Sequence, residues 1–353
     1  MEHGTRDEFW KARDPRPRYR DAKPAVMTVG GWFDAEDLYG ALETYRAFER
    51  GKPRAENVLV MGPWKHGGWA RSDGDKLGDV SFGSKTSLFY REKIELPFFQ
   101  RHLKGKGAAP PPEAWVFETG TDQWMRHASW PPAEAKRETL FFQSNGRLAK
   151  TPPSEAAAYE YVSDPNKPVP YFGKSSASID NDYMAGDQRF AARRPDVVVL
   201  RTGELASDVT LAGPLEASLW VTTTGTDADF VVKLVDVHPQ DDAELGGYQQ
   251  LVRGEIMRGR FRSSFEKPEP FRPNEPALVR FTLPDVSHTF RTGHRIMVQI
   301  QSSWFPLADR NPQTFVDIAK ATEADFRVAT HRILVAPDKP SALSVTVARG
   351  ALP

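Results

Sequence analysis

The apolar residues of this chain change their spacing along the sequence, and that change limits the folds available to it. Two short apolar runs, at residues 25–29 and 57–61, are each followed by glycine and have the length and β-branched content of buried strands. Between them, apolar residues recur at spacings of three, four and seven, which predicts an amphipathic helix over about residues 35–50. A strand, a helix and a strand in this order form a βαβ unit, so we expect parallel strands with a right-handed crossover. A second helix is expected from about residue 85 to 103, interrupted by Pro97.

From about residue 135 the spacing becomes two, which is typical of strands with one buried face. Many short strands with no helical pattern between them indicate an antiparallel sandwich or jelly roll. A stretch rich in Pro, Ser, Ala and Asp, at about residues 144–195, is expected to be a long irregular wrap that joins the two parts. The expected fold class is therefore α/β plus all-β, with a parallel sheet followed by an antiparallel jelly-roll β-sandwich. The alternating segments are residues 216–224, 230–237, 278–283 and 295–301.

Composition and charge exclude several classes of partner. The 47 basic and 47 acidic residues give a formal net charge of zero, so no overall field attracts nucleic acid or an anionic membrane surface. The chain has no cysteine, which excludes disulfides, thiolate metal sites and a cysteine nucleophile. No run of about 18 apolar residues occurs and the first 21 residues are highly charged, so neither a membrane span nor a secretion signal is expected in this sequence. No cellular compartment follows from these features.

Polar side chains follow each of the two predicted parallel strands. The first loop, residues 30–37, contains Asp34, and the second, residues 62–69, contains His66. Ligands of open α/β sheets bind outside the carboxyl ends of the strands. One helix and one strand separate Asp34 from His66, so we expect the two side chains on neighbouring strand ends. An aspartate that accepts a hydrogen bond from the imidazole Nδ1–H orients the ring and stabilises the imidazolium, as the acid of a hydrolase triad does.

Both residues also have a purely structural interpretation. Asp34 and Asp37, at the start of a predicted helix, are typical of an N-cap and a first-turn acid, a role that is compatible with catalysis. His66 stands beside glycines and Trp64, which equally suits a histidine at an interface. The placement of the two loops after successive strands favours the catalytic interpretation.

These two loops resemble a known family. Residues 31–37 (GWFDAED), followed by residues 61–66 (MGPWKH), resemble the acid and base motifs of the superfamily of cocaine esterase, α-amino-acid ester hydrolase, cephalosporin acylase and Xaa-Pro dipeptidyl-peptidase. The Asp-x-Glu-Asp form is most similar to the α-amino-acid ester hydrolases. The resemblance implies that Asp34 and His66 complete a Ser/Asp/His triad. It also implies that Glu36 and Asp37 belong to a carboxylate cluster that binds the α-ammonium group of the substrate.

The resemblance covers nearly the whole chain. It continues through residues 97–99 and 196–203 to residues 287–293 (SHTFRTG), which are similar to the C-terminal jelly roll of that family. It implies that residues 1–135 are the C-terminal part of an α/β-hydrolase catalytic domain. Residues 136–353 are then a jelly-roll domain of the Xaa-Pro dipeptidyl-peptidase C-terminal type. Two domains also suit a length of 353 residues, which exceeds the usual size of a single core.

One departure from the family pattern concerns the nucleophile. α/β-Hydrolases order the triad Ser, Asp, His, with the serine on a Gly-x-Ser-x-Gly turn upstream of the acid. Only 33 residues precede Asp34, none of them is serine, and no Gly-x-Ser-x-Gly occurs anywhere in the sequence. We therefore expect this chain to be the C-terminal half of such an enzyme, without its nucleophile and inactive alone.

The expected function is hydrolysis of esters or amides of α-amino acids through an acyl-enzyme, with His66 as general base and then acid. Two alternatives stay open: an Xaa-Pro dipeptidyl-peptidase, and a non-catalytic jelly-roll module that binds a partner or carbohydrate. No cofactor is expected, and no metal site, because His288 and His294 lie six residues apart without a third ligand. The expected partners are a small amino-acid ester or amide, or a short peptide, and a separate N-terminal half. A homo-oligomer is left open.

Overall fold

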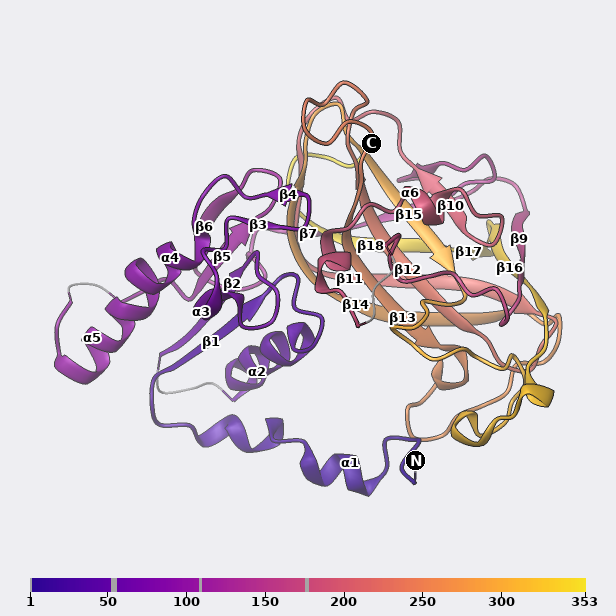
Figure 1. The fold of residues 1–353 in the computed structure, drawn as a ribbon, viewed down its shortest axis with the longest axis horizontal. Coiled ribbons are helices and arrows are strands. Elements are labelled where there is room, and N and C mark those ends of the chain that lie inside the picture. The colour runs from indigo at the N-terminus through magenta and orange to yellow at the C-terminus, as the bar shows by residue number, and fades with distance from the viewer. Residues whose placement is uncertain (1, 52–55, 108–109, 175–177) are drawn as a thin grey trace.

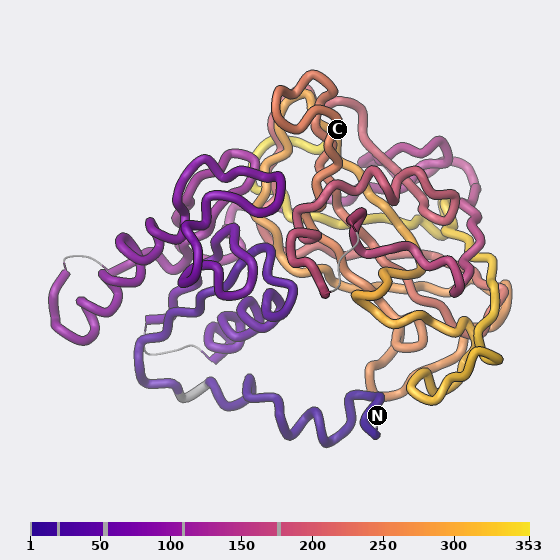
Figure 2. The backbone as a smooth tube through the Cα atoms, in the orientation of Figure 1, coloured from indigo at the N-terminus to yellow at the C-terminus, as the bar shows by residue number. Residues whose placement is uncertain are grey.

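The computed structural model of this protein describes residues 2–51, 56–107, 110–174 and 178–353. Helices α2 to α5 and a small sheet lie on one side, and the strands from β7 onward form a larger body on the other (Figure 1). The continuous trace in Figure 2 shows the N-terminal segment running below the small sheet toward the larger body. There Arg6 donates its backbone N–H to the carbonyl of Phe265 at 2.9 Å. Within the described ranges, no helix is long and apolar enough to cross a membrane.

The small sheet has the strand order β1-β2-β5-β6. β1 pairs in parallel with β2, as the strand–helix–strand order predicted, and β2 pairs in parallel with β5. β6 returns antiparallel to β5. The sequence pattern did not identify β5 and β6 as members of this sheet. The bounds are β1 (Val26–Gly31), β2 (Asn57–Gly62), β5 (Ala114–Glu118) and β6 (Gln123–His127), with the short pair β3 (Lys76–Leu77) and β4 (Val80–Ser81) nearby.

Helix α2 (Leu38–Arg50) connects β1 to β2 and buries the apolar side chains that predicted it, among them Leu42 and Tyr45. The helix begins three residues later than expected. Residues 35–37 instead form a turn, because Asp34 Oδ1 accepts the backbone N–H groups of the second and third residues after it, at 2.9 and 3.0 Å.

The second predicted helix is not interrupted at Pro97, so that expectation is wrong. α4 (Thr86–Tyr90) passes into a π-helical turn (Arg91–Glu95) and directly into α5 (Leu96–Lys104). Pro97 lies in the first turn of α5, where a missing backbone N–H costs least, and the wider turn before it accommodates the ring. The remaining helices of this side are α1 (Glu8–Arg13), the 3-10 helix η1 (Arg16–Asp21) and α3 (Gly68–Arg71).

Residues from 136 onward form two antiparallel sheets that face each other across the largest apolar core. One sheet has the order β10-β15-β12-β13, and the other the order β17-β16-β11-β18-β7-β8 with β14 paired to β11 and β9 to β16. The bounds are β7 (Lys136–Phe142), β8 (Leu148–Ala149), β9 (Ala157–Ser163), β10 (Val198–Arg201), β11 (Val209–Thr223), β12 (Asp229–Val237), β13 (Gln249–Arg258), β14 (Ala277–Phe290), β15 (Arg295–Gln301), β16 (Ala329–Ala336), β17 (Lys339–Pro340) and β18 (Ala342–Arg349).

The stretch at 144–195 is less irregular than expected. β9 lies inside it and pairs antiparallel with β16 from Ala157 to Ser163, because its alternating tyrosines suit a half-buried strand. The 3-10 helix η3 (Asn181–Ala185) and helix α6 (Arg189–Ala192) follow. Residues 175–177 of the expected wrap lie outside the described ranges.

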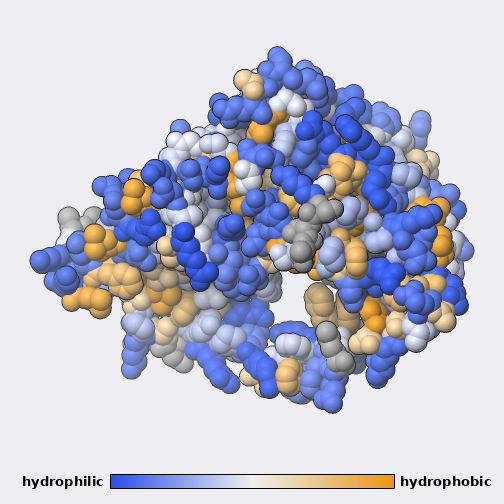
Figure 3. Space-filling view, viewed as in Figure 1, coloured by the Kyte–Doolittle hydropathy of each residue, from blue (hydrophilic) through white to orange (hydrophobic). Residues whose placement is uncertain are grey.

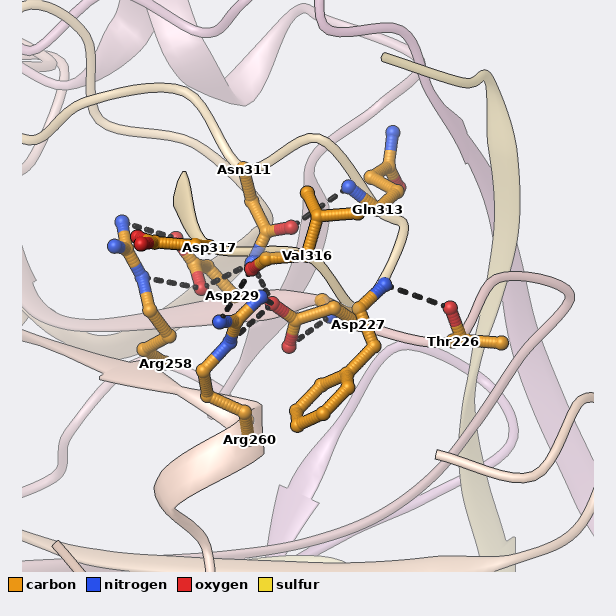
Figure 4. A network of polar contacts seen from close by, with 12 residues as sticks. Thr226, Asp227, Asp229, Arg258, Arg260, Asn311, Gln313, Val316 and Asp317 are labelled. Carbon is orange, nitrogen blue, oxygen red and sulfur yellow. Dashed lines mark hydrogen bonds and ion pairs between the residues drawn. The ribbon is translucent and has the colours of Figure 1, made fainter. Parts of the chain in front are cut away.

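A buried polar network fixes the long loop between β15 and β16 to the sandwich (Figure 4). Asn311 Nδ2 on this loop donates to Asp227 at 3.1 Å and to Asp229 at 2.7 Å. Arg260 lies 2.6 Å from Asp227, and Arg258 lies 3.3 Å from Asp229, whose pKa is raised by burial to about 6. The network holds the loop whose first residues reach the candidate site described below. Three short 3-10 helices complete this side: η4 (Gly259–Phe261), η5 (Ile318–Lys320) and η6 (Glu323–Asp325).

Candidate active site

Asp34 lies in the loop after β1 and is buried, with 2% of its surface exposed. The loop is held against the loop after β2: the backbone N–H of Phe33 donates to the carbonyl of Trp64 at 3.1 Å. Gly31 makes this approach possible, since a Cβ there would lie only 2.1 Å from the Trp64 carbonyl oxygen. One carboxylate oxygen of Asp34 caps the turn before α2, which leaves the other free to face the second loop.

His66 lies in that second loop and faces Asp34. Its Nδ1 is 3.1 Å from Asp34 Oδ2 and 3.3 Å from Oδ1. The same nitrogen is 3.5 Å from Asp37 Oδ2. The His66 side chain is 34% exposed while that of Asp34 is 1% exposed. An ionised carboxylate only accepts hydrogen bonds, so this contact places the proton on Nδ1 and leaves the Nε2 lone pair available for a proton from another group.

Glu36 and Asp37 are exposed at the start of α2, on the same loop as Asp34. Neither is a helix cap by its side chain: Asp37 occupies the N-cap position without a side-chain hydrogen bond to the helix. The side chain that acts as a cap is therefore that of Asp34, which accepts hydrogen bonds from the turn before α2, and not that of Asp37. The structure brings all four expected site residues onto one edge of the small sheet.

A cavity of about 300 Å³ opens beside this edge, between the small sheet and the sandwich. Asp34 and Glu36 line it on one side, and η3, β13 and the loop after β15 line it on the other. Burial raises the pKa of Glu255, the one carboxyl group that the sandwich contributes to the lining. The other lining residues used below are Tyr183, Met184, Trp304 and Leu307.

Arg253 of β13 connects the sandwich to the acid loop. Its Nη1 donates to the backbone carbonyl of Trp32 at 2.8 Å, two residues before Asp34. The guanidinium is 2% exposed, and burial lowers its pKa to about 10, so it still carries its charge near neutral pH. Sequence reasoning missed this contact, because 221 residues separate the two partners and no local pattern marks an arginine that faces away from solvent.

His288 and His294, for which the sequence showed no third potential ligand, both contact the same carboxylate. Asp236 lies between them, and Asp236, His238 and His294 form a group whose ligand atoms are within 4.8 Å of one another. The signal in the sequence was the spacing of two between Asp236, in β12, and His238, which directly follows that strand. The pairing of β12 with β15 is what brings His294 to them.

The fold is similar to those of hydrolases of known structure. The CocE/NonD family hydrolase of Staphylococcus aureus superposes with a TM-score of 0.65 at 16% identity, over 98% of this chain and 58% of its own, which shows a common fold. An α-amino acid ester hydrolase gives a TM-score of 0.92 at 38% identity, covering 98% of this chain and 59% of its own. An aminopeptidase from a marine sediment archaeon (Thaumarchaeota) gives 0.94 at 38% identity, with 99% and 59% covered.

Sequence comparison identifies the family. Residues 106–344 match the X-Pro dipeptidyl-peptidase C-terminal non-catalytic domain, and residues 1–68 match the X-Pro dipeptidyl-peptidase (S15 family). Cocaine esterase of Rhodococcus sp. (strain MB1 Bresler) is 31% identical over 97% of this chain. The chain spans 59% of the length of that esterase. The chain belongs to the X-Pro dipeptidyl-peptidase C-terminal domain family, within the superfamily of serine hydrolases that includes cocaine esterase and the α-amino-acid ester hydrolases.

Proposed function

We propose that this chain contributes the acid and the base of a serine hydrolase that cleaves esters or amides of α-amino acids through an acyl-enzyme. The observation that carries the proposal is the 3.1 Å contact between Asp34 Oδ2 and His66 Nδ1 at the ends of neighbouring parallel strands. In this proposal His66 Nε2 accepts the proton of the serine hydroxyl and later returns it to the leaving group, while Asp34 holds the ring and stabilises the imidazolium. Both residues lie in the part that matches the S15 peptidase family.

The domain assignment is part of this proposal. Residues 1–135 form the C-terminal part of an α/β-hydrolase domain, and residues 136–353 form a jelly roll. The parallel order β1-β2-β5 supports the first assignment, and the two facing antiparallel sheets support the second. The boundary follows the change of sheet, since β6 ends at His127 in the small sheet and β7 begins at Lys136 in the sandwich.

The nucleophilic serine comes, in this proposal, from polypeptide outside these 353 residues. Among the described residues, His66 Nδ1 contacts the carboxylates of Asp34 and Asp37, and the sequence has no Gly-x-Ser-x-Gly turn. Two surfaces are suited to receive that polypeptide. β1 is an edge strand of apolar composition with four half-buried residues, whereas β2 beside it is fully buried. The second surface lies on helices α4 and α5, where apolar side chains gather (Figure 3) and Leu88, Leu96, Phe99 and Leu103 are exposed.

The absence of a nucleophile predicts the outcome of active-site labelling. A positioned base without a serine cannot form a covalent intermediate, so the purified 353-residue chain is expected not to react with a fluorophosphonate probe. Intact-mass spectrometry after incubation with the probe measures this directly. Stoichiometric labelling of a serine in this chain, abolished by His66→Asn, would place the nucleophile here and contradict the proposed origin of the serine.

The proposed specificity is for substrates with a free amine. Glu36 lines the cavity, Asp37 follows it on the same exposed loop, and the half-buried Glu255 adds a carboxyl group from the sandwich side. Apolar residues such as Met184 and Leu307 supply room for a side chain between them. Two of the structural relatives are an α-amino acid ester hydrolase and an aminopeptidase, and both names describe substrates with an amino group near the scissile carbonyl.

Exchange of both exposed carboxylates tests this specificity. In the enzyme assembled with its serine-bearing part, Glu36→Gln with Asp37→Asn is expected to lower kcat/KM for an amino-acid ester by ~10–100-fold, because hydrogen bonds to charged groups contribute ~1.5–3 kcal/mol each. The same ester without the amine is the control and should change little. Stability should stay within about 0.5 kcal/mol, since neither side chain caps the helix. Equal losses of kcat/KM on both esters would show that Glu36 and Asp37 do not bind the amine, and the enzyme would then be a generic esterase.

A peptidase is the second candidate function. The match of residues 1–68 to the S15 family and the aminopeptidase among the structural relatives favour it. Both candidates use the same acid, base and amine-binding carboxylates, so they differ in the leaving group. A comparison of kcat/KM for an amino-acid ester, an aminoacyl anilide and an Xaa-Pro dipeptidyl anilide with the assembled enzyme separates them.

A further inference from the structure

One carboxylate and three histidines meet at an end of the sandwich, outside the Asp34–His66 pair. His288 Nε2 on β14 is 3.1 Å from Asp236 Oδ2, and His294 Nδ1 just before β15 is 2.9 Å from Asp236 Oδ1. The ring of His238, which follows β12, lies with its centroid 4.5 Å from that of His294. β12, β14 and β15 therefore direct four ionisable side chains to one point, although 58 residues separate Asp236 from His294 in sequence.

The cluster has a buried negative charge at its centre. Asp236 and His288 are 1% and 2% exposed, and the side chains of His238 and His294 are 11% and 10% exposed. Burial alone would raise the pKa of Asp236, but hydrogen bonds from His288 and His294 lower it to about 2. The carboxylate is thus ionised at neutral pH, and among the described residues its ion pairs are with His288 and His294.

His238 offers a lone pair that the protein does not use. Its Nε2 lies 3.3 Å from Gln250 Oε1, and because a carbonyl oxygen only accepts, this contact puts the ring proton on Nε2. Nδ1 then carries the lone pair, yet it is buried and has no hydrogen-bond partner among the described residues. The carboxylate of Asp242 faces it, with Oδ2 at 3.6 Å from Nδ1. A histidine that donates one ring N–H to a carbonyl and keeps the other nitrogen bare has the arrangement of a metal ligand.

We propose that Asp236, His238 and His294 bind a divalent transition metal of the zinc class. Their ligand atoms lie within 4.8 Å of one another, whereas bonds of about 2.0–2.1 Å in a tetrahedral site require separations of roughly 3.3 Å. The side chains must therefore move together by about 1 Å or more when the metal binds. Asp242 or a water molecule completes the coordination. His294 can bind through Nδ1 only as the tautomer that carries its ring proton on Nε2, so the hydrogen bond from Nδ1 to Asp236 is given up when the metal binds.

His288 has a supporting role in this site. It donates Nε2–H to Asp236 Oδ2, and its Nδ1 is 2.8 Å from Thr119 Oγ1, at the end of β5. Metal-bound carboxylates are commonly held by such hydrogen bonds. Because β5 belongs to the small sheet and β14 to the sandwich, a metal here would stabilise the contact between them rather than take part in the reaction at His66.

Zinc titration of the untagged 353-residue chain tests the proposal. After treatment with a chelator, isothermal calorimetry is expected to give one site with Kd below about 1 μM. At a hundredfold excess of zinc over Kd, Tm is expected to rise by roughly 4 °C. Co²⁺ in place of zinc should give the visible absorption of a tetrahedral complex. Absence of saturable binding up to about 100-fold above that Kd would overturn the proposal.

Variants assign the ligands. His238→Asn, at the most exposed of the three positions, is expected to weaken zinc binding at least 100-fold, and His288→Asn to weaken it by ~10–100-fold. His102→Asn, a change to a surface histidine far from the cluster in sequence, should leave Kd unchanged. If His238→Asn perturbs folding, loss of the Co²⁺ absorption on His294→Gln serves as the second test. Unchanged affinity in both His238→Asn and His294→Gln would show that the cluster is a hydrogen-bonded network alone.

Discussion

Asp34→Asn is expected to lower kcat/KM of the assembled enzyme by roughly 10⁴-fold, the loss that follows when the acid of a Ser/His/Asp triad is made neutral. The asparagine carbonyl can keep the two hydrogen bonds from the backbone N–H groups of Glu36 and Asp37. Its amide nitrogen then occupies the place of Oδ2 and donates to His66 Nδ1. The imidazole is forced to carry its proton on Nε2, where it cannot accept one from serine.

The matched control for this variant is Asp37→Asn. Asp37 Oδ2 is also near His66 Nδ1, at 3.5 Å, but its side chain is 70% exposed and water screens its charge. On an ester without an amine, Asp37→Asn should lower kcat/KM by less than about tenfold. Comparable losses in the two variants would mean that the carboxylates share the orientation of His66, and an unaffected Asp34→Asn enzyme would remove Asp34 from the triad. Denaturation midpoints of both variants exclude loss of folding as the cause.

The pairing of Asp34 with His66 could be predicted because it depends only on local patterns. Two short apolar runs separated by an amphipathic helix define parallel neighbours, and residues just after such strands must meet at one edge. The glycines there are informative for the same reason: Gly31 is the position at which the two loops touch. What local pattern could not supply is the other wall of the cavity.

That other wall is built from contacts that are remote in sequence. Arg253 reaches the carbonyl of Trp32 from the third quarter of the chain, and Tyr183 arrives with a 3-10 helix inside the stretch that was expected to be irregular. The same limitation applies to Asp236 and His294, whose meeting depends on the register of β12 against β15. Alternation assigns a residue to a face of a strand, but it does not say which strand lies opposite.

His331 gives a second large effect, on stability, with a defined dependence on pH. This residue of β16 is 0% exposed, and neither ring nitrogen has a hydrogen-bond partner among the described residues. Its ring packs between those of Tyr161 and Phe230, with centroids at 5.5 and 5.8 Å. Burial lowers its pKa to about 4, since the charged imidazolium would have no compensating partner.

The sign of the effect follows from which state binds the proton. Below its pKa of ~6.5 the histidine of the unfolded chain binds a proton, whereas in the folded protein it does so only near pH 4. Acid therefore lowers the free energy of unfolding between these two pH values. At pH 4.5 the loss is on the order of 2–3 kcal/mol, and at pH 7.5 it is close to zero. His331→Leu, which fills the site without a titrating group, is therefore expected to gain roughly 2–3 kcal/mol of stability relative to the parent protein on going from pH 7.5 to 4.5. Urea denaturation at the two pH values measures this difference, in which the titration of all other groups cancels. The control is Val335→Ala, a buried change in the same strand, which should destabilise the protein equally at both pH values. If the difference between His331→Leu and the parent protein is also independent of pH, the imidazole takes up its proton in the folded core as readily as in the unfolded chain, and the prediction is wrong.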